Sequence, residues 1–129
     1  MTAVLDEVAR ELVDGRNVAT LATVNPDGQP QLSIVFVKRE DDVVIFSTLA
    51  GRQKTRNMLR DPRVTVLIVN PAGGYVEIRG AVEIVDDPEK LLPKEMYAKY
   101  MGGVEPPPEP EVERVIVRVK PAKVVRFSP

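Results

Sequence analysis

The fold class is decided by the stretch Val18-Ala19-Thr20-Leu21-Ala22-Thr23-Val24, which is followed at once by Asn25-Pro26-Asp27-Gly28. In the first segment small or apolar side chains alternate with threonines, which is the pattern of a half-buried β-strand. The second segment is a turn in which Gly28 can supply a positive φ. The chain therefore turns back, and residues 30–39 are predicted to form the second strand of an antiparallel hairpin.

Further β patterns follow along the chain. Val76, Ile78, Val82 and Ile84 alternate with charged or small residues, and Gly80 between them indicates a bulge or a bend. Alternation and turn residues together predict strands at residues 43–48, 64–69, 75–85, 112–119 and 124–127.

Three segments have the spacing of short helices. In residues 2–14 apolar side chains recur at helical intervals. In residues 51–59 arginines recur every four positions, and Asp61-Pro62 ends the helix because the residue before proline avoids the helical region. A third helix is predicted to begin near Asp86 and to be disturbed by Pro93.

The order of these elements predicts a mainly β protein, an antiparallel barrel with short peripheral helices. Tight turns join the strands, and neither βαβ spacing nor the motif GxGxxG appears. No linker or internal repeat divides the sequence, so residues 1–129 are expected to form a single domain.

Composition excludes several classes of function. The sequence has no cysteine and no histidine, which removes disulfides, thiolate nucleophiles, histidine acid–base catalysis and the zinc sites that need these ligands. Asp86, Asp87 and Glu89 coincide with a predicted turn and helix start, where acidic residues are expected, so no metal site is predicted. Catalytic residues stay unassigned.

Charge and hydropathy bear on partners and location. Lys plus Arg total 18 against 19 Asp plus Glu, and aromatic residues are few, so neither nucleic acid nor an anionic membrane surface is an expected partner. No apolar run approaches the roughly 20 residues of a membrane-spanning helix. Residues 1–10 are acidic and amphipathic, unlike a secretory signal, so a cytoplasmic location is expected.

The strongest candidate site runs from a strand end through a turn of small residues into a helix, over residues 47–57. A helix N-terminus offers unpaired N–H groups, and hydroxyl, Arg and Lys side chains add further donors, so this segment could hold a phosphate. The residues concerned are Ser47, Thr48, Arg52, Lys54, Thr55 and Asn57. A solvated basic helix face that binds no ligand would explain the same residues equally well.

A second candidate lies on the predicted strand 30–39. Gln31 and Ser33 share one face and could hydrogen-bond a flat heterocycle in an apolar slot, or could simply belong to a partly exposed strand end. Tyr75 and Glu77 could line a cleft, although packing is the more common role of a single tyrosine. Tyr97 and Tyr100 are interpreted as packing residues.

The order of several motifs resembles the pyridoxamine-phosphate-oxidase-like split β-barrel superfamily, and more closely its actinobacterial branch of enzymes that use the deazaflavin coenzyme F420. The resemblance covers nearly the whole chain. It is carried by residues 17–31, by Gly51-Arg52-Gln53-Lys54-Thr55-Arg56-Asn57 with Asp61-Pro62-Arg63, and by Glu113-Arg114-Val115-Ile116-Val117.

The resemblance implies a split antiparallel β-barrel that transfers hydride between coenzyme F420 and a small unsaturated substrate. The alternatives are an FMN-binding oxidoreductase of the same fold and a non-catalytic flavin-binding protein. Family members are homodimers with the cofactor at the subunit interface. The implied cofactor contacts are Arg52, Lys54 and Thr55 at the phosphate with Asn57 supporting the turn, Ser47 and Thr48 along the ribityl chain, Gln31 and Ser33 near the ring, and Tyr75 and Glu77 reaching the partner's site.

Overall fold

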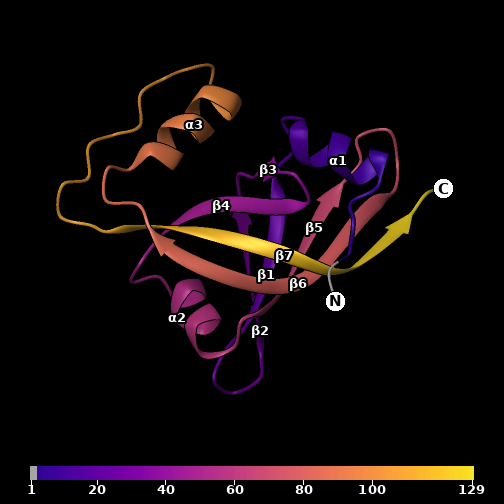
Figure 1. Cartoon of the computed structure of the whole chain (residues 1–129), viewed down its shortest axis with the longest axis horizontal. Helices are drawn as coiled ribbons and strands as arrows, with labels where there is room; N and C mark the ends of the chain where they lie inside the picture. The colour runs from indigo at the N-terminus through magenta and orange to yellow at the C-terminus, as the bar shows by residue number, and fades with distance from the viewer. Residues whose placement is uncertain (1–2) are drawn as a thin grey trace.

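A computed structural model describes residues 3–129 as seven strands and three short helices (Figure 1). No helix in this range is long and apolar enough to cross a membrane. In chain order the elements are α1 (Glu7–Asp14), β1 (Ala19–Val24), β2 (Pro30–Val35), β3 (Lys38–Glu40), β4 (Val43–Leu49), α2 (Gln53–Arg60), β5 (Arg63–Val69), β6 (Tyr75–Asp86), α3 (Leu91–Tyr100) and β7 (Arg114–Phe127).

The seven strands form one antiparallel sheet in the order β2-β1-β5-β6-β7-β4-β3. The outermost strands, β2 and β3, are separated in sequence only by Phe36 and Val37. Three peptide steps span at most roughly 11 Å, whereas six spacings between strands cover roughly 29 Å. The sheet must therefore curl until its edges approach, which confirms the predicted mainly β, split-barrel fold.

The bend at Gly80 is also confirmed. The pairing of β6 with β7 shifts register between Arg79 and Gly80, and Gly80 lies opposite Pro121. A Cβ atom at Gly80 would lie 2.3 Å from the carbonyl oxygen of Lys120, so only glycine allows this approach. The prediction of two separate strands near the C-terminus was wrong, because Pro121 sits at the irregularity, where its missing N–H is tolerated, and β7 continues through it.

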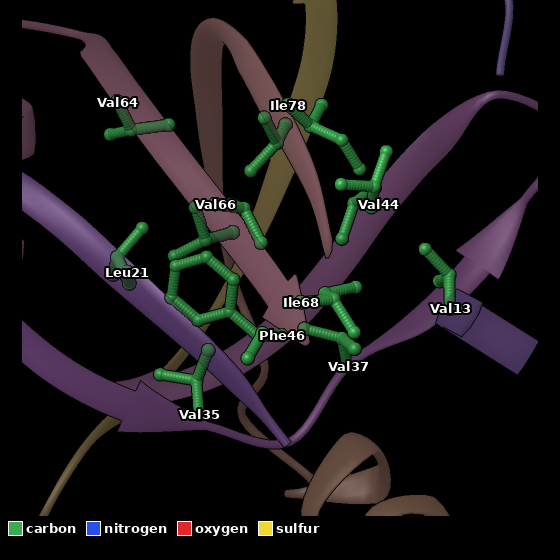
Figure 2. Close-up of a cluster of buried hydrophobic side chains, with 14 of the residues drawn as sticks. Val13, Leu21, Val35, Val37, Val44, Phe46, Val64, Val66, Ile68 and Ile78 are labelled. Atoms are coloured by element: carbon green, nitrogen blue, oxygen red, sulfur yellow. The ribbon is translucent and has the colours of Figure 1, made fainter. Parts of the chain in front are cut away.

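The core fills the interior of the curled sheet. Phe46 is fully buried in this interior, and Figure 2 shows side chains of several strands and of α1 that belong to the same buried cluster. These include Leu21, Val35, Val44, Val66, Ile78 and Val13. The alternation that predicted the strands thus sends one face of each into a common core.

Several predicted boundaries differ from the structure. Helix α1 begins at Glu7 instead of residue 2, because the Asp6 carboxylate caps it by accepting from the Ala9 N–H; residues 1 and 2 lie outside the described range. Helix α2 begins at Gln53 instead of residue 51. Helix α3 begins at Leu91, and Pro93 does not disturb it because it occupies the first turn, where backbone N–H groups lack helical partners.

The predicted strand over residues 30–39 is interrupted at Phe36 and Val37. At this break the Val37 N–H donates to the Tyr100 hydroxyl, and the Val37 carbonyl accepts from the Lys99 ammonium. Side chains of α3 thus satisfy the backbone N–H and carbonyl groups of Val37, which a continuous strand would have paired. The break lets the chain cross from one edge of the sheet to the other.

Candidate functional site

A cavity of about 360 Å³ opens where the end of β4, the start of α2, the start of β7 and one side of α3 meet. Its apolar lining comes mainly from β2, from the break after it and from α3, and includes Ile34, Phe36, Pro93 and Met96. Its polar lining comes from β4, α2, α3 and β7 and consists of Ser47, Thr48, Arg52, Lys54, Tyr97 and Arg114. The cavity therefore suits a ligand with one apolar part and one anionic part.

Three cationic side chains line this one cavity. Burial, together with the positive charges of Arg52 and Arg114, lowers the pKa of the half-buried Lys54. Within residues 3–129, neither Arg52 nor Lys54 forms an ion pair with a carboxylate. The cluster therefore carries positive charge for which a bound anion would be the natural counterion.

The backbone at the start of α2 favours an anion at the same place. Arg52 is the N-cap residue, and it makes no side-chain capping hydrogen bond. The first turn of a helix leaves N–H groups without helical partners and carries the positive end of the helix dipole. Because α2 also has no acidic residue in its first turn, this end of the helix stays electropositive.

Ser47 adds an unsatisfied hydroxyl. Its Oγ atom is buried and has no hydrogen-bond partner among the described residues, although the side chain lines the cavity. Buried hydroxyls are normally hydrogen-bonded. A polar ligand atom in the cavity would supply the missing partner, so the residues present fit a phosphate-bearing cofactor.

Two predicted contacts, Thr55 and Asn57, point into the protein instead of lining the cavity. The buried Thr55 hydroxyl donates to the Leu49 carbonyl at 2.7 Å. The Asn57 amide is buried and donates to Thr23 Oγ1 at 3.0 Å and to Asn25 Oδ1 at 2.9 Å. Both side chains hold α2 against β1 and β4, so they position the start of α2 beside the cavity.

The remaining predicted residues lie elsewhere in this chain. Gln31 accepts from the Thr23 hydroxyl at 2.9 Å, and the buried Ser33 Oγ lacks a partner among residues 3–129; neither lines the cavity. Tyr75 stacks on Phe127 at the beginning of β6. Glu77 pairs with Arg79 at 3.0 Å. The length of β6 separates Tyr75 and Glu77 from the cavity, so their predicted role requires a second chain.

Sequence reasoning missed two polar residues of the cavity, Arg114 and Tyr97. Arg114 pairs with Leu49 in the ladder between β4 and β7, which brings it beside the start of α2. The motif around Arg114 was recognised, but the strand pairing that places it is not readable from one sequence. Tyr97 was interpreted as packing, whereas it lines the cavity from α3.

Comparison with known proteins gives a family match over most of the chain. The sequence model of the family described as pyridoxamine 5'-phosphate oxidase matches residues 5–126. The pyridoxine/pyridoxamine 5'-phosphate oxidase of Bordetella pertussis (strain Tohama I) is 36% identical over 86 residues, which make up 65% of this chain and 41% of that protein. The match thus spans about two-fifths of the length of this curated relative.

Two solved structures are similar over nearly their whole length. One, an F420 reductase, is 33% identical with a TM-score of 0.83, covering 90% of this chain and 94% of that one. The other, a conserved hypothetical protein from Mycobacterium tuberculosis, is 28% identical with a TM-score of 0.79, covering 98% of this chain and 86% of that one. These matches agree with the resemblance inferred from the motifs.

Proposed function

The chain belongs to the pyridoxamine 5'-phosphate oxidase family, and on this premise we propose that it is an oxidoreductase that binds coenzyme F420 and transfers hydride between it and a small unsaturated substrate. The observation that carries the proposal is the convergence of Arg52, Lys54 and the start of α2 on one cavity. These groups would hold the phosphate of the cofactor. FMN, which also carries a phosphate, is the alternative ligand.

The polar groups of the cavity would make different kinds of contact with the cofactor. Lys54 and Arg52 supply charge, and the N–H groups at the start of α2 supply directed hydrogen bonds. Ser47 would donate its unpartnered hydroxyl to an oxygen of the cofactor. Because Lys54 is half-buried, its contact with an anion is less screened by water than that of an exposed lysine.

The apolar residues of the cavity provide the place for a ring. Phe36, Pro93 and Met96 line it, and the second core cluster of Ile45, Leu92 and Met96 holds α3 against β4. The deazaflavin ring, when bound, supplies the hydride chemistry itself. The walls from β2 and α3 orient that ring and exclude water, which is the contribution expected of a chain without histidine or cysteine.

Coenzyme F420 is preferred over FMN because of the extent of the similarity. The F420 reductase matches this chain over 94% of its own length, whereas the match to the pyridoxine/pyridoxamine 5'-phosphate oxidase covers 41% of that protein. Tyr97, which lines the cavity from α3, would contact the bound cofactor or the substrate.

The protein is proposed to act as a homodimer with the cofactor near the subunit interface. Leu32 and Ile34, on the outward face of β2, are 62% and 61% exposed in the single chain. Large apolar side chains exposed side by side favour burial in an interface. Tyr75 and Glu77 would then reach the site of the partner chain.

Spectroscopic titration of the purified protein with F420 and with FMN tests the choice of cofactor. Tighter binding of F420, and oxidation of its reduced form in the presence of a quinone-like acceptor, is the expected result. Tight FMN binding with negligible F420 binding would show that FMN is the cofactor, and the proposed phosphate site would still stand. Binding of neither compound would contradict the proposed function.

A further inference from the structure

Arg114, the third cation of the cavity, differs from Arg52 and Lys54 in having an internal partner. Its Nε and Nη2 atoms donate to the same carboxylate oxygen of Glu109, at 3.1 and 2.9 Å. The side chains of Arg114 and Glu109 are 23% and 25% exposed, so the pair is sheltered but not sealed from water. Arg114 therefore lines the cavity and also pairs with a carboxylate of its own chain.

Glu109 belongs to the irregular segment 101–113, which follows α3 and contains the proline run at residues 106–108. The backbone of this segment has its own anchors, because Lys90 Nζ donates to the Glu109 carbonyl and the Ala50 N–H donates to the Glu113 carbonyl at 2.9 Å. The side chain of Glu109 could thus turn away from Arg114 without release of the segment. Most residues of 101–113 are exposed, so a freed carboxylate would reach water directly.

We propose that Glu109 is an internal competitor for the cofactor phosphate: it holds Arg114 in the free protein, and Arg114 exchanges this carboxylate for the phosphate when the cofactor binds. The inference rests on the proposed function, because it assigns a further positioning residue to the same site. It follows from the convergence of three cations on one cavity, of which two lack a carboxylate partner in residues 3–129.

The exchange replaces one charge-assisted contact of Arg114 by another. A guanidinium binds both carboxylate and phosphate groups through the same planar fork of donors. A partly exposed ion pair contributes little on its own, so breaking it opposes binding only weakly. Glu109 would therefore lower the affinity for phosphate-bearing ligands while neutralising Arg114 in their absence.

The test compares Glu109→Gln with wild type in titrations with two ligand pairs that differ by a phosphate-bearing group, namely FMN against riboflavin and F420 against its phosphate-free deazaflavin precursor. Glu105→Gln is the matched control, because it removes one negative charge from the same segment at an exposed residue that makes no ion pair within residues 3–129. The double variant Glu109→Gln/Arg114→Met shows whether any gain depends on Arg114.

The expected result is that Glu109→Gln strengthens binding of the phosphate-bearing form by roughly threefold to tenfold. Glu109→Gln should bind the phosphate-free form as wild type does. Glu105→Gln should bind both forms as wild type does. The double variant should lose the gain in affinity for the phosphate-bearing form. Unchanged or weakened binding of the phosphate-bearing form by Glu109→Gln would overturn the inference, as would an equal gain for both forms. If Lys54→Ala leaves binding intact as well, the proposed site itself fails.

Discussion

At the scale of single residues, Asn57 links the helix beside the cavity to the hairpin that decides the fold. Besides its two donated hydrogen bonds to Thr23 and Asn25, it accepts from Gln53 Nε2 at 2.8 Å. The Thr23 hydroxyl, which accepts from Asn57, in turn donates to the side-chain oxygen of Gln31. A fully buried amide with its hydrogen bonds satisfied fixes the position of α2 on β1.

Replacing Asn57 by Leu should lower the free energy of unfolding by about 2–3 kcal/mol, because partners of a buried amide are left unsatisfied. Urea unfolding measures this change. Leu59→Ala is the control, since Leu59 lies on the same helix and is 68% exposed, and its loss should change stability by no more than about 0.5 kcal/mol. Equal, small effects of the two substitutions would contradict the role given to Asn57.

The residue types of the site were predictable, but the direction of each side chain was only partly so. A basic turn at a helix start identified Arg52 and Lys54, and the structure brings both to one cavity with Ser47 and Thr48. Thr55 has the same local signal. Its hydroxyl nevertheless donates to the Leu49 carbonyl. A sequence does not show whether such a hydroxyl binds a backbone carbonyl or a ligand phosphate.

At the scale of elements, α3 is a wall of the cavity, and its last turn adds polar anchors to the apolar packing of Leu92 and Met96. The Tyr100 ring stacks on Phe36 with 4.3 Å between centroids, and its hydroxyl lies 2.9 Å from the Asn17 carbonyl and 3.0 Å from that of Val37. Lys99 Nζ donates to the carbonyls of Val13 and Val37, at 2.6 and 2.7 Å. The two side chains join α3 to α1 and to the break between β2 and β3.

Tyr100→Phe should keep the ring stack and remove the hydroxyl, which leaves the Val37 N–H without this partner. We expect a loss of about 1–2 kcal/mol of unfolding free energy and faster amide hydrogen exchange in α3. Tyr97→Phe serves as the control, since the Tyr97 hydroxyl makes no hydrogen bond to residues 3–129. Faster exchange in both variants, or in neither, would count against an anchoring role of Tyr100.

The elements themselves were largely predictable because their patterns are local. Alternation located the strands and Gly80 located the bend, as the structure confirms. The break at Phe36 and Val37 was missed because alternation continues through it. Its cause, the contact with Tyr100 and Lys99, comes from more than 60 residues further along the chain.

At the scale of the whole molecule, closure of the sheet leaves an apolar face of β2 exposed. If this face is the proposed dimer interface, light scattering should give twice the mass of the 14.3 kDa chain. Leu32→Glu should shift the population to monomer, because the carboxylate would be buried in the interface. Val104→Glu, which places the same charge at an exposed apolar residue of segment 101–113, should leave the mass unchanged. A monomeric wild type would contradict the proposal.

Surface carboxylates set the dependence of stability on pH. Hydrogen bonding from Arg63 lowers the pKa of Asp61 to about 2, and hydrogen bonds from Arg39 and Arg118 lower the pKa values of Asp14 and Glu40. A carboxyl group with a lowered folded pKa stabilises the protein above its unfolded pKa, and the contribution is lost as pH falls through the folded value.

Because the sequence has no histidine, the urea midpoint should be nearly constant from about pH 8 to pH 5. It should then fall steadily from about pH 4 to pH 2. High salt should weaken this dependence, since the pairs are exposed. A marked loss of stability between pH 8 and pH 6 would show that other groups control it.

The central claim is that the cations at the start of α2 hold the phosphate of a flavin-type cofactor. Calorimetric titration of Lys54→Ala with F420 and FMN tests it most directly, with Lys123→Ala, an exposed lysine outside the cavity, as the control. The account predicts that Lys54→Ala weakens binding by roughly tenfold to a hundredfold and that Lys123→Ala leaves it unchanged. Equal affinity of wild type and a folded Lys54→Ala variant would contradict the claim.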